Sequence, residues 1–298
     1  MKIAFIGLGQ MGKPMAANLL RYHSQLTVIS RSTRAYPDLT KSGATIASSM
    51  DDLSASDIVF LSLPDDHVVS EVLFGSNGLA SRLKPGSLVV DTSTISPEAA
   101  LRVNDRLAVT GIRFLDAPVS GMAKRAHDGT LTMMCGGDRG AYDEVLPYLH
   151  SMASKTLYMG DAGMGQLSKL INQLLYNINC AALAEILPLA VKLGLDSEKV
   201  AEIVNSGTGR SHASDYFLER ILKGDFSSAY PLQDAYKDLV NASAITYRHG
   251  LPTPLLSAAS GIYQAALLQG YGNEDKGAMI KVYEQSLGVR FRAAANEA

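Results

Sequence analysis

The first twenty residues constrain the fold more than any other part of the sequence. An apolar run over 2–7 predicts a buried strand, and apolar residues at helical spacing over 12–23 predict a helix. Between them, Gly7, Gly9 and Gly12 stand at the spacing G-x-G-x-x-G. A strand, a glycine-rich turn and a helix in this order are typical of the first unit of a dinucleotide-binding fold. The alternative is a tight strand–helix turn that binds nothing.

Each of these glycines has a separate expected role. Gly7 permits the tight turn, Gly9 lets a pyrophosphate approach the backbone, and Gly12 lets the helix pack against the sheet. The amino end of the helix offers the anion unpaired N–H groups and the positive end of the helix dipole. The turn therefore predicts a set of cofactor-binding residues, namely Gly7, Leu8, Gly9, Gln10, Met11 and Gly12.

The end of the second predicted strand, over 26–30, indicates which nicotinamide cofactor binds. An acidic residue there holds the ribose 2′-hydroxyl of NAD, whereas an arginine accommodates the 2′-phosphate of NADP. The sequence has Ser30, Arg31 and Ser32 at this point and no carboxylate. Because Arg31 offers a planar guanidinium to a phosphate, NADP is the expected cofactor. The alternative is a solvated Arg31 that stacks on adenine and leaves NAD possible as well.

Short apolar runs and helical patterns alternate through the first half of the chain. The further predicted strands are 26–30, 57–64, 87–93, 113–118, 131–137 and 156–160. This alternation predicts an α/β fold, with a doubly wound parallel sheet in an N-terminal Rossmann domain over 1–162. No strand pattern follows residue 160, so the sequence predicts an all-helical C-terminal domain over 163–298.

The longest helical pattern, over 166–195, is apolar nearly all round. A helix without a polar face is buried, either between domains or between subunits. We therefore expect the helical domain to join copies of the chain into a homodimer or homotetramer.

Composition narrows the classes of partner. The 27 basic and 29 acidic side chains give a net charge of −2, so no broad basic field is available for nucleic acid or an anionic membrane. No uncharged run of 18 residues predicts a membrane span, and a strand that starts at Lys2 leaves no room for a targeting segment. Cys135 and Cys180 predict neither a disulfide framework nor a metal site. A cytoplasmic protein is expected.

Four later stretches complete a family resemblance that begins with "FIGLGQMGKPMAANLL" at 5–20. They are "DTSTISP" (91–97), "DAPVSGMAKRAHDGTLTMMCGG" (116–137), "GMGQLSKLINQLL" (163–175) and "YPLQDAYKDL" (230–239). In this order, along nearly the whole chain, they resemble the β-hydroxyacid dehydrogenases. That group contains 3-hydroxyisobutyrate dehydrogenase, tartronate semialdehyde reductase and the glyoxylate/succinic semialdehyde reductases. The resemblance implies an oxidoreductase that uses NADP or NAD on a small β-hydroxy acid or its semialdehyde.

The resemblance also implies catalytic roles for two residues. In the family, the lysine that matches Lys169 exchanges a proton with the substrate oxygen while hydride moves to or from nicotinamide. Apolar surroundings and a cationic nicotinamide would lower the pKa of this lysine, which suits acid–base work. Asn172 lies three residues further on, on the same helix face, and would orient Lys169 or a substrate hydroxyl. The alternatives are a lysine beside a domain interface and an asparagine that only satisfies backbone groups.

Ser120 and Gly121 match the substrate loop of the family, which presents a hydroxyl and backbone N–H groups to a substrate carboxylate. The family commonly has a second glycine where Met122 stands, so the identity of the substrate stays open. Arg210 is a further candidate for binding a carboxylate.

Four more cofactor contacts follow from the resemblance, namely Leu63, Pro64, Thr94 and Lys237. Leu63 and Pro64 match a turn that lines the cofactor, and Thr94 matches a threonine near the nicotinamide ribose. Lys237 matches a lysine that contacts the cofactor from the helical domain. The alternatives are a strand terminator for Pro64, a helix cap for Thr94 and a surface ion pair for Lys237.

Two other functions remain as rivals. Imine reductases share this architecture in related proteins but typically lack the lysine that matches Lys169. A noncatalytic scaffold that senses a dinucleotide would also tend to lose that lysine and would carry an added interaction module. The presence of Lys169 favours the dehydrogenase over both.

Overall fold

The computed structural model describes residues 1–298 except residues 24, 228–229 and 295–298. The chain divides into two compact units, Met1–Lys169 and Leu170–Ala298, and the division falls inside one long helix.

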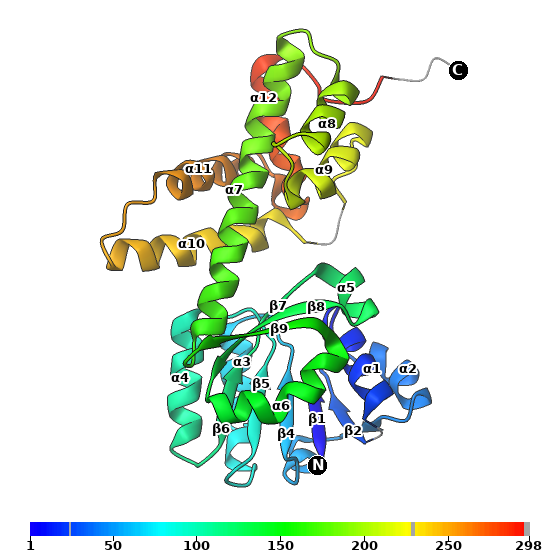
Figure 1. The fold of residues 1–298 in the computed structure, drawn as a ribbon, viewed down its shortest axis with the longest axis vertical. Coiled ribbons are helices and arrows are strands. Elements are labelled where there is room, and N and C mark those ends of the chain that lie inside the picture. The colour runs from blue at the N-terminus through cyan, green and yellow to red at the C-terminus, as the bar shows by residue number, and fades with distance from the viewer. Residues whose placement is uncertain (24, 228–229, 295–298) are drawn as a thin grey trace. The chain divides into compact units, whose positions relative to one another are not determined.

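The first unit is built on a nine-stranded sheet (Figure 1). Its strands are β1 (Ile3–Ile6), β2 (Leu26–Ile29), β3 (Thr45–Ile46), β4 (Ile58–Leu61), β5 (Leu88–Asp91), β6 (Arg113–Asp116), β7 (Val119–Ser120), β8 (Leu131–Gly137) and β9 (Ala153–Gly160). The order is β3-β2-β1-β4-β5-β6-β8-β7, with β9 paired to β8. The first six of these are mutually parallel in the Rossmann order 3-2-1-4-5-6, which confirms the predicted α/β class. In contrast, β8 runs antiparallel to β6 and β7, which was not predicted.

Helices cover both faces of this sheet. They are α1 (Gly12–Tyr22), α2 (Tyr36–Lys41), α3 (Asp66–Phe74), α4 (Pro97–Ala108), α5 (Met122–Asp128) and α6 (Arg139–Met152). Along β1, Phe5 packs into a core with Met15 and Leu19 of α1, whereas Ile6 packs into a core that includes residues of α3 and α4. A strand that is buried on both faces is apolar at every position, which explains the uninterrupted apolar runs in the sequence.

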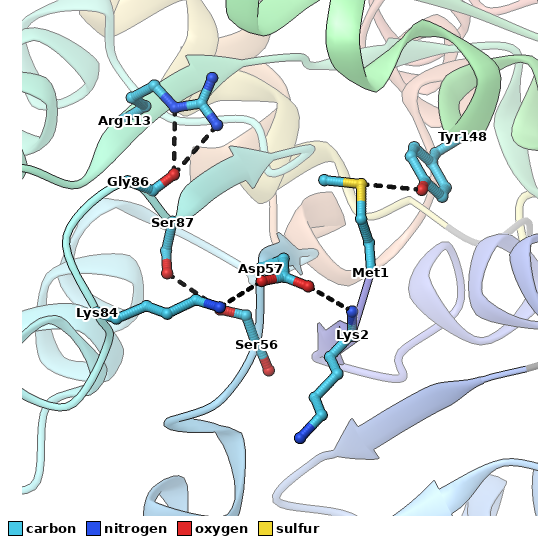
Figure 2. Close-up of polar contacts among 9 residues, drawn as sticks. All are labelled: Met1, Lys2, Ser56, Asp57, Lys84, Gly86, Ser87, Arg113 and Tyr148. Atoms are coloured by element: carbon cyan, nitrogen blue, oxygen red, sulfur yellow. Dashed lines mark hydrogen bonds and ion pairs between the residues drawn. The ribbon is translucent and has the colours of Figure 1, made fainter.

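Polar contacts join the amino ends of the central strands (Figure 2). The Asp57 carboxylate accepts hydrogen bonds from the Lys2 backbone N–H at 2.7 Å and from Lys84 Nζ at 2.5 Å. The Arg113 guanidinium donates to the Gly86 carbonyl at 3.1 and 3.3 Å. Charged side chains thus stabilise this edge of the sheet. The carboxyl ends of the strands lie at the opposite edge, where ligands bind in folds of this type.

The second unit is helical. Its elements are the remainder of α7 (Met164–Lys192), then α8 (Ser197–Ser206), α9 (His212–Lys223), α10 (Leu232–Arg248), α11 (Pro254–Leu268) and α12 (Ile280–Leu287). Helices α10 and α11 pack against each other as a hairpin (Figure 1). Phe217, Leu239, Tyr263 and Phe291 are among the fully or nearly fully buried side chains of its core. Beyond Gly160, the described residues form no further named strand.

Helix α7 is long and apolar enough to cross a membrane by length and composition alone. Lys169 and Glu185 interrupt its apolar pattern, so the sequence has no uncharged run of 18 residues there. One third of its most apolar window is buried within the structure, and Cys180, Ala184 and Leu187 belong to the core of the second unit. Because the core helix of a globular protein passes the same test, this observation is weak evidence for a membrane span.

Candidate active site

The glycine-rich turn after β1 has the geometry that its three glycines predict. Gly7 has φ +94°, a left-handed conformation, and a Cβ there would overlap the carbonyl oxygen of Ser62. A Cβ on Gly12 would overlap the carbonyl oxygen of Gly7. A Cβ on Gly9 would meet nothing within 4 Å. The turn is therefore closed on the protein side and open at Gly9, which fits a ligand phosphate that approaches the backbone.

The amino end of α1 is also free for an anion. Its N-cap, Met11, makes no capping side-chain hydrogen bond, and the first turn carries no acidic residue. Gln10 is exposed, whereas Leu8 is buried and donates its backbone N–H to Ser30 Oγ at 3.3 Å. The positive end of the helix dipole at this point favours a bound phosphate.

The end of β2 presents arginine rather than a carboxylate. Tyr36 fixes Ser30 through two hydrogen bonds, since its hydroxyl donates to the Ser30 carbonyl at 3.0 Å and accepts from the Ser30 N–H at 2.8 Å. Arg31 and Arg34 follow and are both exposed. This chemistry fits the phosphate of NADP better than the bare ribose of NAD.

The loops after β4 and β5 are tied to each other. The Leu63 N–H donates to Ser93 Oγ at 2.8 Å, and the Ser93 N–H donates to Asp91 Oδ1 at 2.9 Å. Leu63 and Thr94 are half-buried and Pro64 is exposed. The structure therefore brings two of the predicted nicotinamide-side segments together at the carboxyl edge of the sheet.

The junction between β7 and α5 contains a strained residue. Gly121 has φ +137°, and Met122 has φ +61°, the one positive value among non-glycine residues that the structure describes. A left-handed conformation favours glycine, so the backbone explains why the family commonly has glycine at this position. The Met122 side chain is 38% exposed, and Ser120 is half-buried just before it.

The start of α7 is fixed by a buried carboxylate. Asp116, at the end of β6, is fully buried and accepts hydrogen bonds from the Gly163 N–H at 2.7 Å and the Gln166 N–H at 2.8 Å. Burial raises the pKa of Asp116 to about 6 despite these bonds. Burial likewise raises the pKa of Asp91 to about 6, and the Asp116 charge adds to that effect. Lys169 follows Gln166 by one turn of α7 and is 8% exposed.

The predicted site residues are divided between the units. The first unit holds the glycine-rich turn, Arg31, the loops at Leu63 and Thr94, the substrate loop and Lys169, whereas Asn172 and Lys237 belong to the second unit and are exposed. Sequence reasoning missed several polar residues with structural partners here, namely Asp91, Asp116, Gln166 and Gln173. Gln173 donates to Asp238 Oδ2 at 3.2 Å. Its position four residues after Lys169, on the same helix face, is the one sequence feature that could have marked it as a candidate.

Arg210 forms an exposed ion pair with Asp215 at 2.9 Å. Among the residues that the structure describes, no three His, Cys, Asp or Glu side chains group as a metal site would require. The arrangement in the first unit therefore combines a glycine-rich turn that is open at Gly9, a polar loop and a buried lysine. Such a set can bind a dinucleotide and exchange a proton with a bound substrate.

Two family models match most of the chain. Residues 2–160 match the NAD binding domain of 6-phosphogluconate dehydrogenase. Residues 163–283 match a domain described as the NAD-binding domain of NADP-dependent 3-hydroxyisobutyrate dehydrogenase.

Individual proteins resemble the chain over nearly its whole length. The 2-(hydroxymethyl)glutarate dehydrogenase of Eubacterium barkeri is 38% identical over 290 residues, which cover 97% of this chain and 96% of that protein. The solved 3-hydroxyisobutyrate dehydrogenase of Salmonella typhimurium has a TM-score of 0.86 at 30% identity, over 95% of this chain and 99% of that one. The protein Psf3, solved in complex with NADP+ and 2-OPP, has a TM-score of 0.82 at 29% identity, over 94% and 99%.

The imine reductase of Streptomyces aurantiacus has a TM-score of 0.63 at 24% identity, over 95% of this chain and 99% of that one, which shows a shared fold alone. The two family models and the 2-(hydroxymethyl)glutarate dehydrogenase match the stretches of sequence that carry the motifs. The chain therefore belongs to the 3-hydroxyisobutyrate dehydrogenase family of NAD(P)-dependent oxidoreductases.

Proposed function

We propose that this protein catalyses hydride transfer between NADP(H) and a small β-hydroxy acid or its semialdehyde. Candidate substrates are 3-hydroxyisobutyrate, tartronate semialdehyde, glyoxylate and succinic semialdehyde. The observation that carries the proposal is the buried Lys169, on a helix whose start Asp116 fixes at the same sheet edge as the open Gly9 turn. The relative that acts on 2-(hydroxymethyl)glutarate, a hydroxy acid, supports this substrate class.

The chain's own residues fit NADP. The N–H groups of residues 9–12 would bind the pyrophosphate, since those of Gly7 and Leu8 already donate to Ile29 and Ser30, and Arg31 would bind the 2′-phosphate. Leu63, Pro64 and Thr94 would contact the nicotinamide side, and Lys237 keeps the cofactor role that its motif implies. When bound, the nicotinamide supplies or accepts the hydride. The solved Psf3 complex with NADP+ supports this cofactor, and NAD remains the alternative.

The substrate would be held and protonated by three residues of the first unit. The Ser120 hydroxyl and the Gly121 N–H would bind its carboxylate. In the reduction, the Lys169 ammonium would donate a proton to the carbonyl oxygen, which becomes the hydroxyl. In the oxidation, the neutral Lys169 amine would accept that proton. Asn172 keeps the orienting role that its motif implies.

We further propose that residues 1–162 act as the cofactor domain and that residues 163–298 complete the substrate site and join subunits. Large apolar side chains on α7 support assembly, since Leu175 and Ile186 are 63% and 55% exposed in one copy. A homodimer or homotetramer at micromolar concentration is expected by sedimentation. The two unpaired, buried cysteines support a cytoplasmic location.

A substrate panel read at the nicotinamide absorbance band tests the function. Each candidate acid or aldehyde is run with NADP(H) and NAD(H) on the wild type, on Lys169→Ala and on Lys155→Ala, an exposed lysine of the same unit that serves as the control. We expect turnover of at least one substrate, a loss of about 10²–10⁴-fold in Lys169→Ala and wild-type rates in Lys155→Ala.

Two outcomes would overturn the proposal. Full activity in Lys169→Ala would remove the proton-transfer role from this residue. Turnover of a cyclic imine but of no hydroxy acid or aldehyde would assign the protein to imine reduction.

Arg31→Ala tests the cofactor preference. It should lower kcat/KM with NADP(H) by about tenfold or more and leave kcat/KM with NAD(H) unchanged, since it removes a charge-assisted contact to the 2′-phosphate.

A further inference from the structure

The side chain of Gln166 forms a two-point link between α7 and the loop after β5. Its Nε2 donates to the Ser93 carbonyl at 2.8 Å, and its Oε1 accepts from the Ile95 N–H at 3.2 Å. The two backbone groups stand on either side of Thr94. Gln166 is 1% exposed, so water cannot replace these bonds without entering the core. The side chain therefore pairs with this loop as a neighbouring strand would.

The helix end of this link is rigid. Asp116 holds the N–H groups of both Gly163 and Gln166. A Cβ on Gly136 would lie 2.7 Å from the Asp161 carbonyl oxygen, and a Cβ on Gly165 would lie 2.7 Å from the Asp116 carboxylate. The first turn of α7 thus presses directly on the sheet, and its position is set independently of the Gln166 side chain.

The loop after β5 is also held at Ser93 by residues at the edge of the sheet. Ser93 donates its N–H to Asp91 Oδ1 and accepts from the Leu63 N–H, so its neighbours on the sheet edge fix it. Ile95, by contrast, has Gln166 Oε1 as the acceptor of its N–H. Beyond Ile95, Ser96 donates its N–H and its hydroxyl to the Asp66 carboxylate. Removing the Gln166 amide would therefore free the short segment Thr94–Ile95 between Ser93 and Ser96, while the start of α7 stays in place.

We infer that Gln166 is a positioning residue that sets the backbone at Thr94 relative to Lys169. This inference rests on the proposed function, which gives Thr94 a cofactor contact and Lys169 the proton transfer. Gln166 acts through these two residues and not on the substrate or the cofactor itself. Since reacting groups must be held within a fraction of an ångström, a shift of about 1 Å in this spacing would cost up to about 10²-fold in rate.

Two substitutions separate positioning from packing. Gln166→Leu keeps the approximate size of the side chain and removes both hydrogen bonds. Gln166→Glu restores them only when its carboxyl is protonated, because a neutral carboxyl has one donor and one acceptor whereas a carboxylate has no donor for the Ser93 carbonyl. The neighbouring charged groups Asp91, Asp116 and Lys169 are present in the wild type too, so the ratio of variant to wild-type rate at each pH isolates residue 166.

The expected results are specific. Gln166→Leu should lower kcat by about 10–100-fold with little change in KM, and should raise the deuterium isotope effect measured with 4-deuterated reduced cofactor. Without cofactor, amide exchange at Ile95 should become at least tenfold faster. For Gln166→Glu, the rate relative to wild type should rise as pH falls, and Ile95 exchange should slow over the same range.

A matched control is Ser168→Ala on the same helix, since the Ser168 hydroxyl donates to the Met164 carbonyl of α7 itself at 2.7 Å. It should leave kcat and Ile95 exchange at wild-type values. Wild-type kcat per folded molecule in Gln166→Leu, or a Gln166→Glu ratio that is flat with pH, would overturn the inference while the proposed function stands. Full activity of Lys169→Ala, with Gln166 unchanged, would instead overturn the proposed function.

Discussion

The Asn18 side chain, on α1 behind the glycine-rich turn, donates a hydrogen bond of 2.7 Å to the carbonyl of Ala126, on α5 after the substrate loop. A second, longer contact of 3.4 Å reaches the His127 carbonyl. Asn18 is 1% exposed, and α5 ends at this point with Gly129 in a left-handed conformation. One buried amide thus fastens the helix of the substrate loop to the helix of the cofactor turn.

Replacing Asn18 by leucine should destabilise the protein by about 1–3 kcal/mol, because the buried carbonyl of Ala126 loses its donor. Urea unfolding of both proteins measures this difference. Asn104→Ala is the control, since Asn104 bonds only to the exposed Asp105 at 3.2 Å and should change stability by less than about 0.5 kcal/mol. Equal unfolding midpoints for Asn18→Leu and wild type would show that the bond contributes nothing.

Gly9→Ala and Gly12→Ala form a matched pair that separates binding from folding. A methyl on Gly9 enters open space, so the unfolding free energy should stay within about 0.5 kcal/mol while the dissociation constant for NADPH rises about tenfold or more. A methyl on Gly12 would overlap the Gly7 carbonyl, so stability should fall by about 1–3 kcal/mol. Urea unfolding without cofactor and a nicotinamide fluorescence titration give both quantities. Destabilisation by Gly9→Ala alone would contradict the assignment.

Much of the fold could be predicted because β1, β4 and β5 are buried on both faces and therefore read as apolar runs. Strands β3 and β7 have two residues each, too few for a periodic pattern. The direction of β8 was also missed. A run such as "LTMMCGG" carries no sign of whether its neighbour is parallel, since the path of the connecting chain decides that.

The candidate site was predictable where one residue type suits one local task, as with Gly7 and Gly12 in the turn. It was not predictable where a polar side chain meets backbone groups far away in the sequence. Asp116 bonds to Gly163, 47 residues on, and Gln166 bonds to Ser93, 73 residues back. A polar residue in the sequence does not indicate its hydrogen-bond partner, so these roles become visible only in the folded structure.

The strained conformation of Met122 gives a third prediction. At φ +61° a side chain with a Cβ costs about 1 kcal/mol or more, which roughly offsets the entropy that glycine would lose on folding. Met122→Gly should therefore keep or slightly raise stability, whereas the β-branched Met122→Val should lower it by about 1–2 kcal/mol. Urea unfolding decides this, and equal stability of the Val and Gly variants would show that the backbone is relaxed at this position. If Met122 narrows the site, kcat/KM for bulkier substrates should also rise in Met122→Gly.

The last prediction uses the pH dependence of stability. Burial raises the pKa of Asp91 to about 6, well above its value of about 3.9 in an unfolded chain, and its Oδ2 has no hydrogen-bond partner among the residues that the structure describes. Between these two pKa values the folded state binds more protons than the unfolded state. The free energy of unfolding is therefore highest when Asp91 is protonated, and it falls as pH rises through about 6. Asp91→Asn cannot ionise and avoids this loss.

The stability of Asp91→Asn relative to wild type should consequently rise by about 2 kcal/mol between pH 4 and pH 7.5, as measured by urea unfolding at each pH. Asp52→Asn provides a contrast of opposite sign. Hydrogen bonds from the Ser48 hydroxyl and from the Ser48 and Ser49 N–H groups lower the pKa of Asp52, so its stabilisation is present at neutral pH and is lost on acidification. The Asp52→Asn variant should have a lower free energy of unfolding than wild type at pH 7.5, and the difference should shrink at low pH. A pH-independent difference for Asp91→Asn would mean that the Asp91 carboxyl keeps the same pKa in the folded and unfolded chain.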